Sequence, residues 1–329
     1  MEYKKFAARK DDEGRRLDKI VRIFLPGISL AQVYKYIRKG LIRVNDKRAK
    51  NDSRISEGDE IQIAAFIFNN GSGLESKNET NKADFQDDWE PDIVFQNEHI
   101  LVINKPYDIS VHGSKNSLEK KILGWYEKNI HKTSLSFRPG PLHRLDRKTT
   151  GLLCFSLSLE GARWFSKNIQ EHVIQKKYQA LLEGHVLKAC WNDKIKKNQE
   201  DEVFHRVKAS LSEDNSDGDS ALTFVTPLVY GHYKYKDFEK EVTLCELDIK
   251  TGRTHQIRAQ SALHSHPLLG DTAYGGEKIK SEMDFYLQAV SLSFPKDNPL
   301  ALPSEIKIRL NDSFIKILKS CSIFEGLGL

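Results

Sequence analysis

Residues 141–155 decide the fold and read Pro-Leu-His-Arg-Leu-Asp-Arg-Lys-Thr-Thr-Gly-Leu-Leu-Cys-Phe. The charged, turn-forming first half leads into residues 152–155, which are apolar and favour a strand. Asp146 stands between Arg144 and Arg147, and nearby cations favour the ionised form of a carboxyl group. Such a carboxylate can serve as a nucleophile or as a general base. The plainer interpretation of an Arg-x-Asp-Arg run alone is a surface salt-bridge cluster.

A second candidate is a tyrosine in a predicted strand. Residues 176–182 read Lys-Lys-Tyr-Gln-Ala-Leu-Leu. Successive side chains of a strand point to opposite faces, so Tyr178 shares a face with Ala180 and Leu182. A tyrosine in such a position is more often a half-buried core residue than a catalytic one. A catalytic role for Tyr178 is therefore supported only by the motifs around it.

A third segment combines a turn with two arginines. Residues 251–258 read Thr-Gly-Arg-Thr-His-Gln-Ile-Arg and follow an alternating strand pattern over residues 242–249. We expect a turn at Gly252 and a helix capped by Thr254. A strand-to-helix junction of this kind is a natural anion site, because free backbone N–H groups and guanidinium groups are both available.

The N-terminal residues have the periodicity of two helices followed by two strands. Ser29 and Gln32 have the spacing of a capping box, and Gly40 is a typical C-terminal cap. The alternating residues 42–44 and 61–63 predict paired strands. The first helix is indicated by apolar residues at helical spacing, namely Leu17, Ile20, Val21, Phe24 and Leu25.

Basic side chains concentrate on the second of these helices and on the adjoining hairpin. Residues 35–50 hold seven cations, opposed by Asp46 alone. An ordinary solvated face is the usual reason for a charge run. Here the concentration on one helix end and its neighbouring hairpin favours a phosphate-binding surface. The residues expected to contact RNA there are Lys35, Arg38, Lys39, Arg43, Lys47 and Arg48.

The distribution of charge suggests two domains in these 329 residues. Apolar residues make up 39%, which excludes wholesale disorder. The net charge of +5 divides into +6 for residues 1–63, −5 for residues 70–92 and about +4 for the rest. The acidic stretch is rich in Gly, Ser and Asn and reads as a linker. We expect a small domain over residues 1–66, a flexible linker over 67–90 and a larger domain over 91–329.

The sequence lacks the motifs that usually indicate several classes of protein. The four cysteines are far apart without a Cys-x-x-Cys pair, which argues against a zinc knuckle and suits a reducing, cytoplasmic location. His264 and His266 have ligand spacing, but no Cys or carboxylate accompanies them, so we expect no metal. Phosphate-loop, nucleophile-elbow and dinucleotide-binding motifs are missing. No apolar run is long enough to span a membrane.

The N-terminal pattern resembles the S4-type RNA-binding domain. The resemblance rests on Arg-Leu-Asp at residues 16–18, on residues 34–45 (Tyr-Lys-Tyr-Ile-Arg-Lys-Gly-Leu-Ile-Arg-Val-Asn) and on residues 57–61 (Glu-Gly-Asp-Glu-Ile). It covers about fifty residues and by itself implies binding of structured RNA.

Five blocks in the rest of the chain, taken in order, resemble the RluA/RluC/RluD family of pseudouridine synthases. The His-Arg-Leu-Asp and Gly-Arg-Thr-His-Gln-Ile-Arg blocks are the most specific of them. The resemblance runs from about residue 92 to residue 294. The blocks are Asn-Lys-Pro and Val-His within residues 104–112, then residues 143–151, 177–180, 251–258 and 266–276.

The resemblance implies an α+β fold, with the small S4-like domain followed by a catalytic domain on a mixed, mostly antiparallel bent sheet flanked by helices. Periodicity agrees with this fold class. We expect strands near residues 100–104, 151–157, 177–183, 242–249 and 285–292, and helices near 117–129, 159–171, 254–264 and 312–320.

The resemblance also implies roles for individual residues. The family isomerises uridine in RNA to pseudouridine without a cofactor. Asp146 matches its essential aspartate, which either attacks the anomeric carbon or removes the neighbouring ribose proton. Tyr178 matches a tyrosine that stacks under the base and helps remove a proton from it, and Arg258 an arginine that pairs with the aspartate. Arg144 matches a side chain that fills the space of the flipped base. Further RNA contacts are expected from His143, Arg253 and Lys105.

Three positions depart from the family pattern. Asp108 stands where glycine is usual, although Asp tolerates left-handed backbone better than most residues. Gln260 and Gln288 stand where histidine is common. Neither glutamine matches a catalytic position, so we expect effects on binding detail rather than on activity.

The expected partner is ribosomal RNA, most similar in pattern to the RluC branch and its 23S large-subunit substrate, as free RNA or in a preribosomal particle. The RluD branch shares the layout and stays an alternative. A non-catalytic RNA-binding or ribosome-assembly factor on the same fold is a second one. A nucleoside hydrolase is disfavoured because no second carboxylate is matched. We expect a monomer with no membrane partner.

Overall fold

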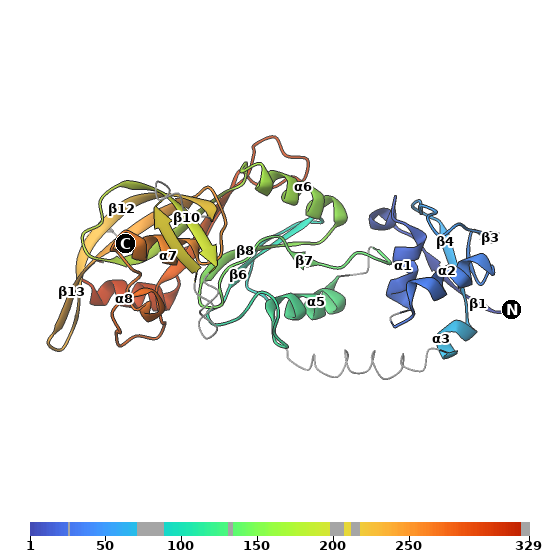
Figure 1. The fold of residues 1–329 in the computed structure, drawn as a ribbon, viewed down its shortest axis with the longest axis horizontal. Helices are drawn as coiled ribbons and strands as arrows, with labels where there is room; N and C mark the ends of the chain where they lie inside the picture. Colours follow the sequence, from blue (N-terminus) through green and yellow to red (C-terminus); the bar gives the residue numbers. More distant parts are fainter. Residues whose placement is uncertain (26, 71–88, 131–133, 198–206, 212–217, 324–329) are drawn as a thin grey trace. The chain divides into compact units, whose positions relative to one another are not determined.

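The computed structural model describes residues 1–25, 27–70, 89–130, 134–197, 207–211 and 218–323 (Figure 1). By compactness the chain divides into two units. The first comprises Met1–Pro91, Glu119–Gly140 and Ser156–Ala162, and the second comprises Asp92–Leu118, Pro141–Phe155 and Arg163–Leu329. The expected linker falls largely on residues 71–88, outside the described residues, so the domain boundaries stay a prediction.

The first unit contains a small antiparallel sheet and, among its helices, the two that the periodicity predicts. The order of its strands is β1-β4-β2-β3. Ser29 Oγ accepts the backbone N–H of Gln32, and the Gln32 side chain accepts the N–H of Ser29, so the predicted capping box is present. The elements are β1 (Tyr3–Ala7), a 3-10 turn (Lys10–Asp12), α1 (Leu17–Phe24), α2 (Leu30–Arg38), β2 (Ile42–Val44), β3 (Lys47–Arg48), β4 (Glu60–Ala64) and α3 (Phe66–Asn70).

The apolar positions of the two helices form the core of this sheet. Leu17, Ile20 and Val21 of α1 pack with Val33 of α2 and with Ile61 of β4, all of them fully buried. Burial of such side chains stabilises the fold by about 1.5–3 kcal/mol each. The apolar residues that the sequence shows at helical spacing therefore form the buried face of α1.

A buried carboxylate ties together distant parts of the first unit. Asp12 is 0% exposed and accepts hydrogen bonds from the N–H groups of Leu135 (2.9 Å) and Ser136 (3.0 Å). The hydroxyls of Ser134 (2.7 Å) and Ser136 (2.6 Å) donate to the same carboxylate, as does the N–H of Arg9 (3.0 Å). Burial raises the pKa of Asp12, but these hydrogen bonds outweigh it and leave the pKa below its ordinary value.

We expect Asp12→Asn to destabilise the first unit by roughly 3 kcal/mol at neutral pH, because an amide faces donors that need an acceptor. Because the pKa of Asp12 is lower in the folded protein, the unfolded chain takes up the Asp12 proton at a higher pH than the folded chain does. The stabilisation from Asp12 is therefore complete above the unfolded pKa and is lost as pH falls through the folded one. Hydrogen exchange of the Leu135 and Ser136 amides at neutral and acidic pH measures both effects.

The exposed neighbour Glu13 offers a matched control for this exchange. Glu13→Gln is expected to leave the exchange rates of both amides close to those of the wild type. Equal protection of the two amides in the Asp12→Asn variant and the wild type at neutral pH would contradict the expectation.

The second unit is built on one large sheet, whose main path runs β11-β10-β12-β13-β9-β14-β8-β6-β5. Every pairing with a defined register in this sheet is antiparallel except that of β14 with β8. The mixed, mostly antiparallel sheet expected from the sequence is confirmed. Its strands are β5 (Ile93–Gln96), β6 (Ile100–Lys105), β7 (Gly140–Pro141), β8 (Thr150–Ser156), β9 (Gln175–Glu183), β10 (Ala189–Lys197), β11 (Val207–Leu211), β12 (Asp219–Tyr235), β13 (Phe238–Ile249), β14 (Leu287–Ser293) and β15 (Glu305–Lys307).

The expected helices are present too. They are α5 (Leu118–Asn129), α6 (Leu159–Gln170), α7 (Gln256–Leu263) and α8 (Asp312–Ser320), with a 3-10 turn at Thr272–Tyr274. Phe314 and Leu318 of α8 pack with Val242 and Leu244 of β13, and Figure 1 shows α8 beside this part of the sheet. None of the helices in the described part of the chain has the length and apolar character needed to cross a membrane.

Candidate active site

The three expected catalytic residues come together in the second unit. Asp146 lies in the loop before β8, Tyr178 on β9 and Arg258 on α7, and all three line one cavity of about 310 Å³. A wider cavity of about 1220 Å³ adjoins it, and Asp146 and Arg258 also line this second cavity. Segments far apart in sequence thus converge on Asp146.

Asp146 is accessible but sheltered, with 17% of its side chain exposed. The expected cation next to it, Arg147, is engaged elsewhere, with its Nε 2.9 Å from a carboxylate oxygen of Asp108. Asp108 has the left-handed backbone expected for it, with φ 60°. The nearest basic group to Asp146 is His255, whose Nε2 lies 3.8 Å from Oδ1.

A buried lysine holds the loop that carries Asp146. Lys105 is 0% exposed, and its Nζ donates to the carbonyls of Pro106 (2.9 Å) and Arg147 (2.8 Å). Burial lowers the pKa of Lys105 to about 8, although the charge of Asp146 opposes this. The expected RNA contact from Lys105 is wrong, because its ammonium group is enclosed by the protein. It fixes the backbone that follows Asp146 instead.

Tyr178 sits in the middle of the sheet. It pairs in register with Leu247 of β13 and Ala289 of β14, and it is only 6% exposed. Burial, and then the charge of Asp146, raise the pKa of Tyr178. Its phenol therefore keeps its proton at neutral pH.

Arg258 has a different partner from the one expected. Its Nε and Nη2 donate to the two carboxylate oxygens of Asp271 at 2.7 and 2.8 Å. Its guanidinium also lies 4.7 Å from the ring centre of Tyr274 and 4.6 Å from that of Phe285. The expected direct pair with Asp146 is therefore wrong. Burial lowers the pKa of Arg258, but Asp271 and, more weakly, Asp146 raise it above its ordinary value.

The turn before α7 is held by a glutamine rather than by a threonine cap. His255, not Thr254, precedes the helix, with left-handed φ 51° and ψ 25° and no cap from its side chain. The Gln256 side-chain oxygen accepts the Thr251 hydroxyl at 2.8 Å and the Arg253 N–H at 3.0 Å. The predicted Thr254 cap is thus wrong. The side chain of Gln256, the first residue of α7, holds the turn through its hydrogen bonds to Thr251 and Arg253.

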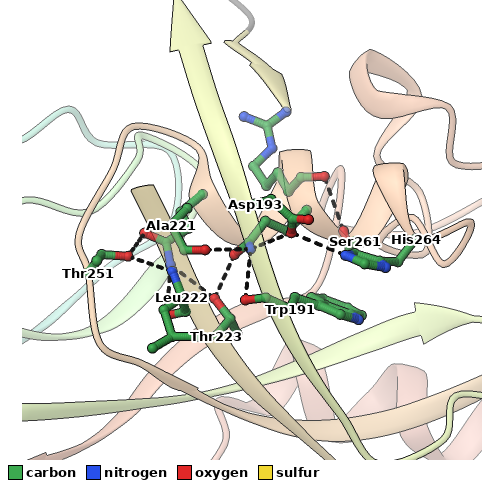
Figure 2. Close-up of polar contacts among 11 residues, drawn as sticks. Trp191, Asp193, Ala221, Leu222, Thr223, Thr251, Ser261 and His264 are labelled. Carbon is green, nitrogen blue, oxygen red and sulfur yellow. Dashed lines mark hydrogen bonds and ion pairs between the residues drawn. The ribbon is translucent and has the colours of Figure 1, made fainter. Parts of the chain in front are cut away.

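A buried polar network then joins α7 to the neighbouring strands (Figure 2). Gln260 donates to Asp193 (2.6 Å) and to the carbonyls of Trp191 (3.2 Å) and Ala221 (3.1 Å), and it accepts the Thr223 hydroxyl at 2.6 Å. Gln260 is 0% exposed, so this departure from the family pattern lies in the protein interior.

The other glutamine that departs from the pattern is buried as well. Gln288 is 0% exposed, donates to the carbonyl of Arg309 at 2.8 Å and accepts the N–H of Asn311 at 3.0 Å. Asn311 precedes α8, and its side chain accepts the N–H of Phe314. Gln288 therefore anchors the start of α8 to the central sheet.

Two family models match the chain over separate segments. Residues 99–263 match the RNA pseudouridylate synthase model, and residues 15–61 match the S4 domain model. The chain belongs to the RNA pseudouridine synthase family. The family match covers Asp146, Tyr178 and Arg258 together with the loop, the strand and the helix that carry them.

Curated relatives of this synthase cover most of its length. Ribosomal large subunit pseudouridine synthase D of Vibrio cholerae is 30% identical over 81% of this chain and 75% of its own. Ribosomal large subunit pseudouridine synthase C of Escherichia coli K12 is 27% identical over 88% of this chain and 87% of its own. The C enzyme of Buchnera aphidicola is 28% identical over 87% of both chains.

Two solved human proteins share the fold of the synthase. RNA Pseudouridylate Synthase Domain Containing 4 aligns with a TM-score of 0.54 and 20% identity, covering 74% of this chain and 96% of that one. RNA Pseudouridylate Synthase Domain Containing 1 aligns with a TM-score of 0.52 and 24% identity, covering 71% and 95%.

The remaining side chains expected to contact RNA differ in accessibility. Arg144 and Arg253 are exposed and line the second cavity of the synthase. His143 is held by the protein, because its Nε2 accepts the N–H of Cys154 at 3.1 Å and its ring stacks on Phe165. Burial lowers the pKa of His143 to about 3, so it carries no charge for a phosphate.

The basic residues of the S4 segment form an accessible surface on the first unit. Arg43 is partly covered, with its Nε donating to the carbonyl of Gly40 at 3.0 Å and its guanidinium 4.9 Å from the ring centre of Tyr3. The exposed members are Lys35 and Arg38 of α2, Lys39 directly after it, and Lys47 and Arg48 of β3. This arrangement leaves five of the six expected cations free to meet solvent.

Sequence reasoning gave no catalytic role to two residues that the structure brings to the site. Asp271 lies in the block of residues 266–276, which as a whole carried the family resemblance. His255 lies inside the most specific block, between the two arginines that drew attention. In the described part of the chain, no group of three or more His, Cys, Asp or Glu side chains is arranged to hold a metal ion.

Proposed function

We propose that this synthase converts specific uridines of large-subunit ribosomal RNA to pseudouridine, with Asp146 as the residue that begins the reaction. The observation that carries the proposal is the convergence of Asp146, Tyr178 and Arg258 on one cavity. The relatives named for the ribosomal large subunit support the substrate. The relatives named synthase C match over more of this chain, whereas the relative named synthase D has a slightly higher sequence identity. The proposal therefore includes both the RluC and the RluD branch.

The chemistry needs only groups that the chain supplies. The N1–C1′ bond of uridine breaks, C5 joins C1′, and a proton moves from C5 to N1, so the product has the same atoms as the substrate. Asp146 either attacks C1′ or removes the ribose proton next to it. Tyr178 supports the uracil ring, and the Arg258–Asp271 pair gives the cavity a rigid, charged wall.

The target uridine must leave its stack to reach Asp146, at a cost of about a few kcal/mol. Arg144 is exposed beside Asp146, where its side chain can fill the vacated space. Arg253 is exposed on the turn before α7 and provides a guanidinium for a backbone phosphate.

The first domain, residues 1–66, would hold the RNA through the basic surface of α2, β2 and β3. The linker over residues 67–90 would connect it with the catalytic domain over residues 91–329. We propose that the protein acts as a monomer in the cytoplasm, on free ribosomal RNA or on a preribosomal particle. Binding through phosphates makes its affinity for RNA fall steeply as salt rises.

Mapping pseudouridines in ribosomal RNA from cells with and without the gene tests this function. We expect one or a few positions in large-subunit RNA to lose pseudouridine and to regain it when the gene is restored. The positions that vanish identify the RluC or the RluD branch. An unchanged map in ribosomal RNA, together with pseudouridines lost from another RNA, would reject the ribosomal substrate and keep the chemistry.

A further inference from the structure

Lys176 is a cation of the catalytic cavity to which the proposed chemistry gives no role. It lies on β9 two residues before Tyr178, and strand geometry puts both side chains on the same face. Both line the cavity of about 310 Å³ that Asp146 also lines, and neither lines the wider cavity of about 1220 Å³. Lys176 therefore belongs to the inner pocket, whereas the exposed arginines Arg144 and Arg253 also face the wider cavity.

The ammonium group of Lys176 has no counter-ion in the described part of the chain. The side chain is partly buried, and it makes no hydrogen bond or ion pair with another described residue. A Cβ atom added to Gly252 would come within 3.1 Å of Nζ, so the ammonium group lies against the turn after β13. The titratable groups coupled to it are Cys154 and His143. Burial raises the pKa of Cys154 and lowers that of His143 to about 3, so both are uncharged at neutral pH.

An unpaired ammonium group in this position is unfavourable for the folded chain. Burial lowers the pKa of Lys176, because the charged form is less well solvated there than in water. Ionisable groups in such surroundings are concentrated at functional sites. A negative charge on the substrate would compensate for the lost solvation, and little water would screen the attraction. The pocket is therefore suited to an anion that is present only with the substrate.

The isomerisation creates such an anion on the uracil ring. Whether Asp146 attacks C1′ or removes the ribose proton next to it, the N1–C1′ bond breaks and its electron pair stays on N1. The charge then spreads over N1, O2 and O4. Lys176 and Tyr178 are about 6.7 Å apart along β9, which is comparable with the width of a pyrimidine and its carbonyl oxygens. A flexible lysine side chain can bring its ammonium group to the edge of a ring that Tyr178 supports.

We propose that Lys176 is a catalytic residue of this synthase, whose ammonium group donates a hydrogen bond to a carbonyl oxygen of the detached uracil. It stabilises the anion that forms when the N1–C1′ bond breaks. The negative charge disappears when an electron pair of the ring forms the C5–C1′ bond. C5 then loses its proton, and N1 gains one. Lys176 keeps its proton throughout and adds no atom to the product. This role rests on the proposed function, because it needs a uracil that leaves its ribose.

Lys176→Met removes the charge and keeps an unbranched side chain. We expect single-turnover pseudouridine formation at saturating RNA to fall about 10²–10³-fold, as it does when a preorganised transition-state donor is lost. RNA affinity should stay within about twofold, with the same salt dependence, because no phosphate contact is removed. Lys176→Arg should keep more activity than Lys176→Met. Stability in urea should be unchanged or higher, because the variant lacks an unpaired, partly buried charge.

Lys177 supplies the matched control. It is the next residue of β9, so its side chain points to the opposite face of the sheet, and it lines neither cavity. Its Nζ lies 2.7 Å from a carboxylate oxygen of Glu246. Lys177→Met should leave the rate of pseudouridine formation close to that of the wild type, because it removes only a partly exposed ion pair.

A better leaving group tests whether the ammonium group acts on the charge of the uracil. Fluorine at C5 withdraws electrons from the ring, so the 5-fluorouracil anion needs less stabilisation from the protein. The test uses RNA with 5-fluorouridine at the target position and follows the loss of the N1-linked nucleoside in a single turnover. We expect the rate defect of Lys176→Met to be smaller on this RNA than on uridine RNA. Asp146→Asn should fail on both RNAs.

The other outcomes contradict the proposal in distinguishable ways. A wild-type rate in Lys176→Met would overturn any catalytic role. Weaker RNA binding with a shallower salt dependence and an unchanged rate at saturation would make Lys176 a phosphate contact. Equal defects on both RNAs, or a rate defect that accompanies a loss of stability, would make it a positioning residue. Wild-type protein that forms no pseudouridine in any ribosomal RNA would reject the proposed function, and the role of Lys176 with it.

Discussion

Replacing Asp146 by Asn is expected to lower pseudouridine formation by on the order of 10³-fold or more, while RNA affinity stays within about twofold. The amide has the shape of the carboxylate but can neither attack C1′ nor take a ribose proton. Little structure depends on the charge, because the nearest basic atom, His255 Nε2, is 3.8 Å away. Single-turnover assays on ribosomal RNA measure the rate, and RNA binding at several salt concentrations measures the affinity.

Asp108 supplies the control for this prediction. It is an acidic residue near the same loop, and its carboxylate pairs with Arg147 on the protein surface. Asp108→Asn should lower the rate by less than about tenfold, because it disturbs only an exposed ion pair. An Asp146→Asn variant that keeps a tenth or more of the wild-type rate would contradict the role of Asp146. Loss of RNA binding in that variant would assign the residue to substrate recognition.

The largest effect on stability is expected from Arg258→Met, at about 3–5 kcal/mol. The side chain of Asp271 is 2% exposed, and its two oxygens accept from Arg258. Removal of the guanidinium leaves this carboxylate buried without its counter-ion. Urea unfolding followed by tryptophan fluorescence reports the change, since Trp191 stacks on His264 one residue after α7.

A double variant separates two contributions to stability, the cost of leaving Asp271 buried without a counter-ion and the net contribution of the Arg258–Asp271 ion pair. Arg258→Met combined with Asp271→Leu should recover most of the lost stability, because it removes both charges together. Arg253→Met, at an exposed arginine of the same turn, should cost less than about 1 kcal/mol. A double variant no more stable than Arg258→Met alone would show that the cost comes from lost packing against Tyr274 and Phe285.

Periodicity predicted most of the elements that frame the site. Apolar runs located β6 and β8, alternation located β13, and helical spacing located α1 and α2. The strands β10 and β12 were missed, because their residues mix polar and apolar types on both faces. The five-residue strand β11 was missed as well. Pro227 also interrupts the pattern of β12, and the pairing with β13 shifts register there, at an irregularity that admits a proline.

The candidate residues were found from motifs, but their partners were not. In the sequence Lys105 looks like a surface cation. The two backbone carbonyls that accept hydrogen bonds from its buried ammonium group are brought together only by the fold. Arg258 and Asp271 are 13 positions apart, across a turn whose path no local pattern fixes. The left-handed backbone of His255 depends on Gln256 closing the turn, a contact of the folded chain rather than of a local preference.

The hydrogen bonds of Asp12 have a consequence for how the chain comes together during its synthesis. Asp12 is made early, but the Ser134 hydroxyl that donates to it lies 122 positions further along. At about 5–20 residues per second, a ribosome needs several seconds to cover that distance. Until then the carboxylate has only water and its own segment as donors. A nascent chain that ends near residue 90 therefore carries the S4 helices and sheet without the bonds from Asp12 to Ser134, Leu135 and Ser136.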